Sequence, residues 1–166
     1  MRVRQIGFLN RPAEDHRRGA ATVEFAIVVP LFLSLVLGIV EMSRALDVST
    51  NLTSAIREGG RLVSMDYTDS IPTGMTTNQK VIQDIRNMLK AAGIPEDKVT
   101  ISITHADGAS AGQDFDFDDP ANKLQNFKIA ASVPYADVSL FPAKIMTNQN
   151  VSAILVMRMG RGSVAE

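Results

Sequence analysis

A single carboxylate, Glu24, stands within a long apolar stretch of the sequence. Arg17, Arg18 and Gly19 precede it, and the run Phe25–Val40 that follows has no charged residue. A charged side chain in a membrane segment costs roughly 2–4 kcal/mol on insertion scales. Glu24 therefore needs a compensating partner. One such partner is Arg17 or Arg18, if the carboxylate extends back to the cytoplasmic headgroups.

Few other residues have types and spacings that suggest chemistry. The acidic run 114–119 begins like a calcium loop, but Asp119 occupies the glycine position and Gln125 the position of the bidentate glutamate. We interpret this run as an exposed acidic loop. His105, with Asp107 nearby, is interpreted as a solvated loop residue at the end of a strand. The sequence contains no nucleophile–base pair, phosphate-binding glycine loop or metal-ligand cluster, so we expect neither an enzyme nor a cofactor.

Composition excludes several further classes of protein. The chain has 166 residues, long enough for one domain with its own core, and a net charge of −1, which gives no basic field for nucleic acid. It has no cysteine, so disulfides and thiolate metal sites are excluded. With no tryptophan and 5% aromatic residues, base stacking is also disfavoured. We expect no nucleic-acid partner.

The N-terminal elements that hold Glu24 are typical of a membrane anchor. Residues 1–19 contain five arginines and two acids, and by the positive-inside rule this leader stays in the cytoplasm, whether or not residues 1–14 are also a disordered basic tail. Residues 20–40 contain one charged side chain and, at about 1.5 Å per residue, extend about 30 Å, the thickness of a bilayer's hydrocarbon core. We predict a transmembrane helix over residues 20–40, with the C-terminal part extracytoplasmic.

Two other interpretations of the apolar run are weaker. A buried helix of a soluble core is disfavoured because the run is apolar on every face. A cleaved secretory signal ending at Ser43-Arg44-Ala45 satisfies the small-x-small rule. However, the leader and the apolar run are both long for a signal peptide, and Glu41 and Arg44 lie around that cut.

Four small or backbone-modifying residues recur every four positions within the run: Ala26, Pro30, Ser34 and Gly38. This spacing places them on one helix face, and such faces let membrane helices approach closely. The face is either a packing seam with a kink at Pro30 or an incidental feature of an apolar segment.

The N-terminal segment resembles the TadE-like pseudopilins of the tight-adherence (Flp pilus) system. The resemblance covers roughly Arg17–Val63 and includes the pattern Arg18-Gly19-Ala-Ala-Thr-Val-Glu24-Phe25-Ala-Ile-Val-Val-Pro30-Leu. It continues with Gly38-Ile-Val-Glu41 and with Ala55-Ile-Arg-Glu-Gly59-Gly60-Arg61. The start of the pattern is also similar to the processing site of type IV prepilins.

The resemblance implies a processing site and an assembly role. In type IV prepilins a membrane peptidase cuts after the glycine, and the similarity implies cleavage after Gly19 here, which would leave Ala20 as the first residue and Glu24 as the fifth, followed by Phe25. The resemblance implies that Glu24 neutralises the new α-amino group of a neighbouring subunit during assembly. It also implies as partners a prepilin peptidase, other pilins or pseudopilins and the pilus assembly platform, at the bacterial inner membrane.

Beyond Val40 the helical pattern continues as an amphipathic extension over residues 41–63. Its apolar residues recur at helical spacing: Met42, Ala45, Leu46, Leu52, Ala55, Ile56 and Val63. Its charged residues are expected on the remaining helix surface: Glu41, Arg44, Asp47, Arg57, Glu58 and Arg61. Gly59-Gly60 is expected to weaken or end the helix, or else to allow close packing.

Residues 64–166 are predicted to form an extracytoplasmic α+β domain. After a loop over residues 66–77, Thr77-Asn78 offers an N-cap for a covering helix over residues 79–92, closed by Gly93. Alternating patterns predict strands over residues 99–104 and 126–133, and the most apolar run, 151–159, is expected to be the central strand. The fold class is therefore α+β, with a small antiparallel sheet, one covering helix and the end of the long membrane-spanning helix.

Two functions from different classes remain. The first is a membrane-anchored minor pseudopilin, processed after Gly19, that takes part in assembly of a Flp-type pilus or tight-adherence secretion apparatus. The second is an uncleaved single-pass membrane protein whose outer domain binds an envelope partner or ligand. The two differ in the N-terminus of the mature protein.

Overall fold

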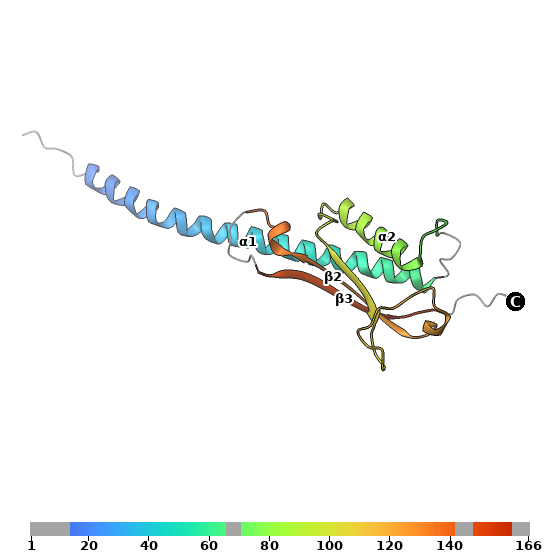
Figure 1. The fold of residues 1–166 in the computed structure, drawn as a ribbon. Coiled ribbons are helices and arrows are strands. Elements are labelled where there is room, and N and C mark those ends of the chain that lie inside the picture. Colours follow the sequence, from blue (N-terminus) through green and yellow to red (C-terminus); the bar gives the residue numbers. More distant parts are fainter. Residues whose placement is uncertain (1–13, 66–70, 142–147, 161–166) are drawn as a thin grey trace, which may run out of the picture. The chain divides into compact units, whose positions relative to one another are not determined.

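Among the described residues, one long helix, a second helix and three strands make up the fold (Figure 1). The computed structural model describes residues 14–65, 71–141 and 148–160. The elements, in chain order, are α1 (Glu14–Ser64), α2 (Thr77–Ala91), β1 (Thr100–His105), β2 (Asn126–Pro134) and β3 (Asn150–Arg158), with short 3₁₀ turns η2 (Pro120–Asn122) and η3 (Tyr135–Asp137). The predicted α+β class is confirmed, and the strands lie within one residue of the predicted bounds.

The chain divides into two structural units, Met1–Val40 and Glu41–Glu166. The first unit contributes the N-terminal half of α1, which begins at Glu14 rather than at the predicted Ala20. The second unit contains the C-terminal half of α1, α2 and the sheet.

The three strands form an antiparallel sheet in the order β1-β2-β3. The prediction that residues 151–159 form the central strand is wrong, because β2 is central and β3 lies at an edge. β2 buries alternate side chains, whereas on β3 Ile154 is 66% exposed and Val156 56% exposed. The apolar run in β3 therefore does not reflect burial on both faces.

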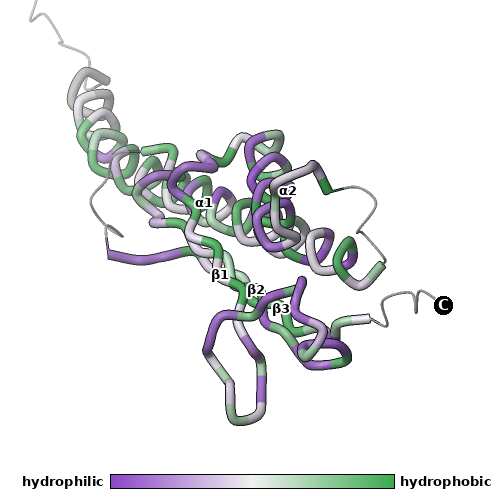
Figure 2. The backbone as a smooth tube through the Cα atoms, turned by 45° about the vertical axis from the view of Figure 1, so that its right-hand side comes forward, coloured by the Kyte–Doolittle hydropathy of each residue, from purple (hydrophilic) through white to green (hydrophobic). Residues whose placement is uncertain are grey.

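One face of the sheet is apolar and packs against the helices. The register aligns Ile103 with Ile129, and Ile129 with Leu155, across the three strands. Figure 2 shows α2, with hydrophilic and hydrophobic residues alternating along its coil, beside the C-terminal half of α1. The fully buried side chains of this core come from both helices, from β2 and from the connecting segments: Val48, Leu52, Ile56, Val81, Ile85, Leu89, Ile94, Val99, Phe115, Phe127, Ile129 and Val133.

Gly59 and Gly60 do not end α1, which continues without a break to Ser64. A Cβ atom on Gly59 would lie 2.7 Å from Cδ1 of Ile85 on α2, and one on Gly60 would lie 2.8 Å from the sulfur of Met157 on β3. The expected helix end is therefore wrong, and the alternative, close packing, is correct. Glycine costs a helix interior about 1 kcal/mol relative to alanine, and here that cost is offset by contact with α2 and the sheet.

The covering helix α2 has a different N-cap from the one predicted. Thr76, rather than Thr77 or Asn78, is the cap: its hydroxyl accepts the Gln79 N–H at 3.2 Å, and its own N–H donates to Oε1 of Gln79 at 3.1 Å. This reciprocal pair is a capping box. At the other end Gly93, at φ +74°, allows the Ile94 N–H to bond the Leu89 carbonyl at 3.0 Å.

Candidate functional site in the N-terminal half of α1

The N-terminal half of α1 is apolar and exposed on nearly all sides. Its most apolar 18-residue window has a mean hydropathy of 2.6, and none of that window is buried within the protein. Phe25 is 68% exposed, Leu31 72% and Ile39 61%. A helix buried in a soluble core would have these side chains covered by other parts of the protein. Within the described residues nothing covers them, so this apolar surface needs another apolar environment. The helix is long and apolar enough to cross a membrane.

The residues of the predicted processing site lie on this exposed helix. Gly19 and Ala20 are within α1, about one turn after its start, and nothing lies within 4 Å of the position that a Cβ atom on Gly19 would take. Glu24 follows Ala20 by four residues, so the two share a helix face. The ion pairs of the described segments all involve residues between Glu58 and Lys98. Processing after Gly19 and pairing of Glu24 with an amine stay predictions.

The predicted packing face of small residues is also exposed. Ala26, Pro30, Ser34 and Gly38 are all exposed, and α1 is continuous through Pro30. Proline lacks an N–H, so the Ala26 carbonyl has no helical donor there. The Ser34 hydroxyl donates to the Leu31 carbonyl at 2.7 Å, which keeps that polar group within its own helix. A helix of another molecule could approach this face closely, and its role in packing stays a prediction.

The C-terminal half of α1 buries one stripe of side chains instead. Leu52, Ala55, Ile56 and Val63 are buried as predicted. The prediction for Met42 and Leu46 is wrong, because they are 60% and 61% exposed. Val48, which had not been singled out, is fully buried in their place.

Glu41 and Arg44 were predicted on the helix surface, but both are half-buried and bonded to the segment after β2. The Glu41 carboxylate accepts the Phe141 N–H at 2.7 Å and the hydroxyl of Tyr135. Nε of Arg44 donates to the Val138 carbonyl at 3.2 Å. Residues 41, 44 and 48 share one helix face. The apolar Val48, which continues the stripe of Leu52 and Ala55 toward Glu41, is the sequence signal that could have identified these contacts.

The hydrogen bond between Glu41 and Tyr135 shifts both pKa values. Donation from the Tyr135 hydroxyl lowers the pKa of Glu41 below its ordinary 4.5. Burial, together with the nearby carboxylate, raises the pKa of Tyr135 to about 12. At neutral pH Glu41 is therefore charged and Tyr135 is a neutral donor. This arrangement fixes the segment 135–141 to the start of the second unit; it does not constitute an acid–base pair for catalysis.

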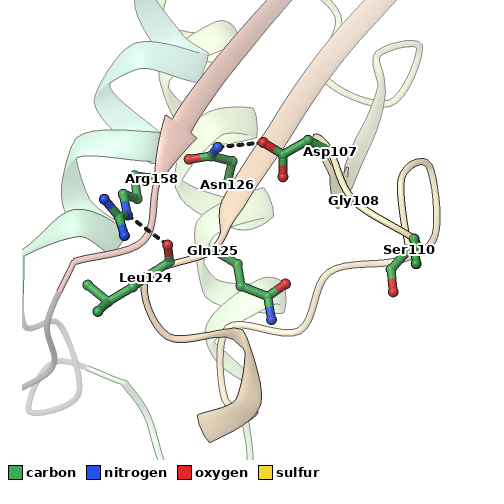
Figure 3. A pocket seen from close by; sticks show the side chains of 8 residues that line it. Asp107, Gly108, Ser110, Leu124, Gln125, Asn126 and Arg158 are labelled. Carbon is green, nitrogen blue, oxygen red and sulfur yellow. Dashed lines mark hydrogen bonds between the residues drawn. The ribbon is translucent and has the colours of Figure 1, made fainter.

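An open polar pocket lies where β1 ends and β2 begins (Figure 3). Its volume is about 450 Å³, and its polar walls include Asp107, Asn126 and Arg158. Nε of Arg158 donates to the Leu124 carbonyl at 2.7 Å, and the Asn126 amide donates to Asp107 at 2.6 Å. Leu124 has a φ of 64°, a left-handed conformation rare for leucine, and its carbonyl is held by this arginine. The two charged residues of the lining, Asp107 and Arg158, are thus both hydrogen-bonded to the segment 124–126 that borders the pocket.

His105 is not the solvated loop residue that was predicted. It is the last residue of β1 and is buried, with its ring 4.6 Å from that of Phe115. The alternation along β1 explains this, because Ile101, Ile103 and His105 point to the same face of the sheet.

The acidic run is exposed at its carboxylates, but its two phenylalanines are buried. Phe115 and Phe117 pack with Phe127 of β2, with centroids 5.0–5.7 Å apart. The carboxylate of Asp118 accepts the Thr77 N–H at 3.0 Å and the Thr77 hydroxyl. The run therefore closes the core over the start of α2. Within the described ranges no group of three His, Cys, Asp or Glu side chains could hold a metal ion.

An exposed apolar helix near the N-terminus, followed by an α+β unit, is an arrangement that suggests a membrane anchor. Residues 19–61 match the family model described as TadE-like protein. The match confirms the resemblance seen in the sequence and relates this segment to membrane proteins of the Tad pilus, a structural family rather than an enzymatic one. Neither a curated protein nor a solved structure matches the chain.

Proposed function

We propose that this protein is a membrane-anchored minor pseudopilin that is processed after Gly19 and takes part in assembly of a Flp-type pilus or tight-adherence secretion apparatus. The observation that carries this proposal is the TadE-like match over residues 19–61, which starts at the predicted cleavage glycine and includes the apolar half of α1. The exposure of Phe25 and Leu31 supports insertion of this half into a bilayer.

Cleavage would create a partner for Glu24. Hydrolysis of the peptide bond between Gly19 and Ala20 releases the leader and leaves an α-ammonium group on Ala20. Each charge alone is costly in a low-dielectric environment, whereas the ammonium and the Glu24 carboxylate attract one another strongly there. In the proposed assembly, Glu24 pairs with the ammonium group of a neighbouring subunit.

The small-residue face supports the same role. Ala26, Pro30, Ser34 and Gly38 are exposed on one side of the apolar helix, and small residues allow membrane helices to pack closely. The proposed partners on this face are the helices of other pilins or pseudopilins. The Ala26 carbonyl, which Pro30 leaves without its helical donor, is free to accept a bond at such an interface.

The proposed topology follows from the charge of the leader. Residues 1–19 stay in the cytoplasm of a bacterial cell until a prepilin peptidase removes them, residues 20–40 cross the inner membrane, and the remainder lies outside the cytoplasm. The assembly platform of the pilus then acts on the mature chain.

The N-terminus of the mature protein tests the proposal. Mass spectrometry of the protein purified from membranes should give a chain that starts at Ala20 when a prepilin peptidase is present, and the intact leader when the peptidase is deleted. A chain starting at Met1 in both strains would favour an uncleaved anchor, and a chain starting at Leu46 would identify a secretory signal.

The role of Glu24 is tested by Glu24→Ala, with Glu58→Ala as the control. Glu58 is a partly exposed acid on the same helix, paired with Arg61 at 2.5 Å, and lies in the second unit. We expect Glu24→Ala to reduce incorporation into the assembly and Glu58→Ala to leave it unchanged. Normal incorporation of the Glu24→Ala protein would reject the pairing role while leaving the cleavage result intact.

A further inference from the structure

Two exposed apolar side chains follow η3, at a segment that is bonded to α1. Leu140 is 58% exposed and Phe141 is 37% exposed. The backbone N–H of Phe141 donates to Glu41 at 2.7 Å, and two residues before Leu140 the Val138 carbonyl accepts from Arg44 at 3.2 Å. We name residues 138–141 the interfacial loop. It is tied to α1 at Glu41 and Arg44.

The attachment points determine where this loop lies relative to a membrane. Glu41 directly follows Val40, the last residue of the apolar run, in the same helix. Glu41 and Arg44 are about 5 Å apart along a helix that rises 1.5 Å per residue. The headgroup layer on each side of a 30 Å hydrocarbon core is about 5–8 Å thick. If residues 20–40 span the bilayer, both attachment points lie in or next to that layer, and so does the loop bonded to them.

We propose that Leu140 and Phe141 insert into the boundary between headgroups and acyl chains, as a second contact of this protein with the membrane. The proposal rests on the membrane anchor of the proposed function and does not require cleavage after Gly19. Leucine and phenylalanine are residue types that enter this boundary in interfacial segments. Met42, which is 60% exposed, adds a third apolar side chain next to the attachment point.

The hydrogen bonds between the interfacial loop and α1 distinguish Leu140 and Phe141 from other exposed apolar side chains. Ile154 and Val156 on β3 are about as exposed as Leu140, at 66% and 56% against 58%, but no hydrogen bond joins them to residues 41–44 of α1 among the bonds of the described residues. Isolated apolar side chains are ordinary on a protein surface and need no partner. Leu140 and Phe141 differ because the bond to Glu41 holds them at the level where the apolar helix ends.

The absence of tryptophan from the chain allows a direct test with single-tryptophan variants. The full-length protein with Phe141→Trp is reconstituted into vesicles of phosphatidylethanolamine and phosphatidylglycerol, with and without brominated acyl chains. Leu33→Trp, in the apolar run, reports on the anchor, and Ile154→Trp, on the sheet, is the control for a surface outside the membrane. We expect Trp emission at position 141 to be blue-shifted and quenched by bromine, emission at 33 to be quenched more strongly, and emission at 154 to be unquenched.

Each other outcome contradicts the proposal in a distinguishable way. Quenching at 33 without quenching at 141 would leave the anchor intact and reject the second contact. A blue shift at 141 that bromine does not quench would show that protein covers the loop. Absence of quenching at both 33 and 141 would reject the anchor and, with it, the membrane contact of the loop.

Discussion

The two halves of α1 are both rich in apolar residues, yet their surroundings differ. In residues 20–40 the apolar side chains occupy all sides of the helix, and Leu31 is 72% exposed. In residues 41–64 one stripe of apolar side chains is buried, and Leu52 within it is fully buried. A helix that is apolar all round needs an apolar solvent, whereas one with a stripe needs a partner surface of the same protein. One continuous helix thus has two different stabilising environments.

Truncation of a leucine should separate the two halves most clearly. Leu52→Ala removes a fully buried side chain from the core, and we expect a loss of about 2–5 kcal/mol in the free energy of unfolding of the second unit. Leu31→Ala makes the same change in the exposed half and should leave that free energy unchanged. Chemical denaturation of the detergent-solubilised protein, followed by circular dichroism, measures both. Equal losses in the two variants would contradict the distinction.

Enlargement of a glycine should give the next largest effect. Gly59→Val places a side chain where even a Cβ atom would lie 2.7 Å from two atoms of Ile85, and overpacking of this kind costs about 1–3 kcal/mol. Gly38→Val puts the same side chain on a helix position with nothing within 4 Å. We expect a lower melting temperature for the first variant only. An unchanged melting temperature for Gly59→Val would show that α2 does not pack tightly on α1 at this position.

Removal of the α2 cap should weaken the cover over the C-terminal half of α1. Thr76→Ala deletes the hydroxyl that accepts the Gln79 N–H, and loss of such a cap costs about 1 kcal/mol. Thr73→Ala, at an exposed position in the preceding loop, is the control. Hydrogen exchange of the first turn of α2 should accelerate in the Thr76 variant. If exchange accelerates equally in both variants, the capping box is not what holds this end.

Protonation of Glu41 should give the smallest effect, since the side chain is partly solvated. Its pKa is lowered in the folded protein, so its contribution to stability is present above the ordinary value of 4.5 and is lost as the pH falls through the lowered value. Glu41→Gln should therefore remove part of the loss of stability below pH 4.5. Tyr135→Phe removes the donor and should raise the pKa of Glu41.

Denaturation curves at several acidic pH values measure this effect. Asp47→Asn removes a charge from an exposed position of the same helix and controls for charge alone. A pH dependence identical in Glu41→Gln and the unaltered protein would contradict the role assigned to the bond with Tyr135.

Local signals in the sequence predicted α2 and the strands to within a few residues. They also predicted the long helix, although it begins at Glu14 rather than Ala20 and does not end at Gly59-Gly60. The apolar run, the alternation around Ile129 and the apolar stripe of Val81, Ile85 and Leu89 each follow from one period along the chain. Thr76 and Gln79 also form a recognisable capping box, although the prediction placed the cap one residue too late.

The features that were predicted incorrectly depend on contacts between distant segments. Gly59 continues the helix because Ile85, from α2, packs against it. β3 is an edge strand because it pairs only with β2 in the described sheet, and its own apolar residues do not indicate which strands pair with it. Glu41 has a charged side chain typical of a surface position, and only the return of the chain at Tyr135 and Phe141 provides its partners.

Serine-to-cysteine variants test most directly whether the first half of α1 lies in a membrane. The chain has no cysteine, and Ser34 and Ser54 are both exposed on α1, in different halves. With the protein in the cell envelope, a membrane-impermeant maleimide is applied from the extracytoplasmic side and again after denaturation in detergent. We predict that the cysteine at position 54 reacts from outside and that the one at position 34 reacts only after denaturation. Equal labelling of both positions in the intact membrane would contradict the membrane anchor.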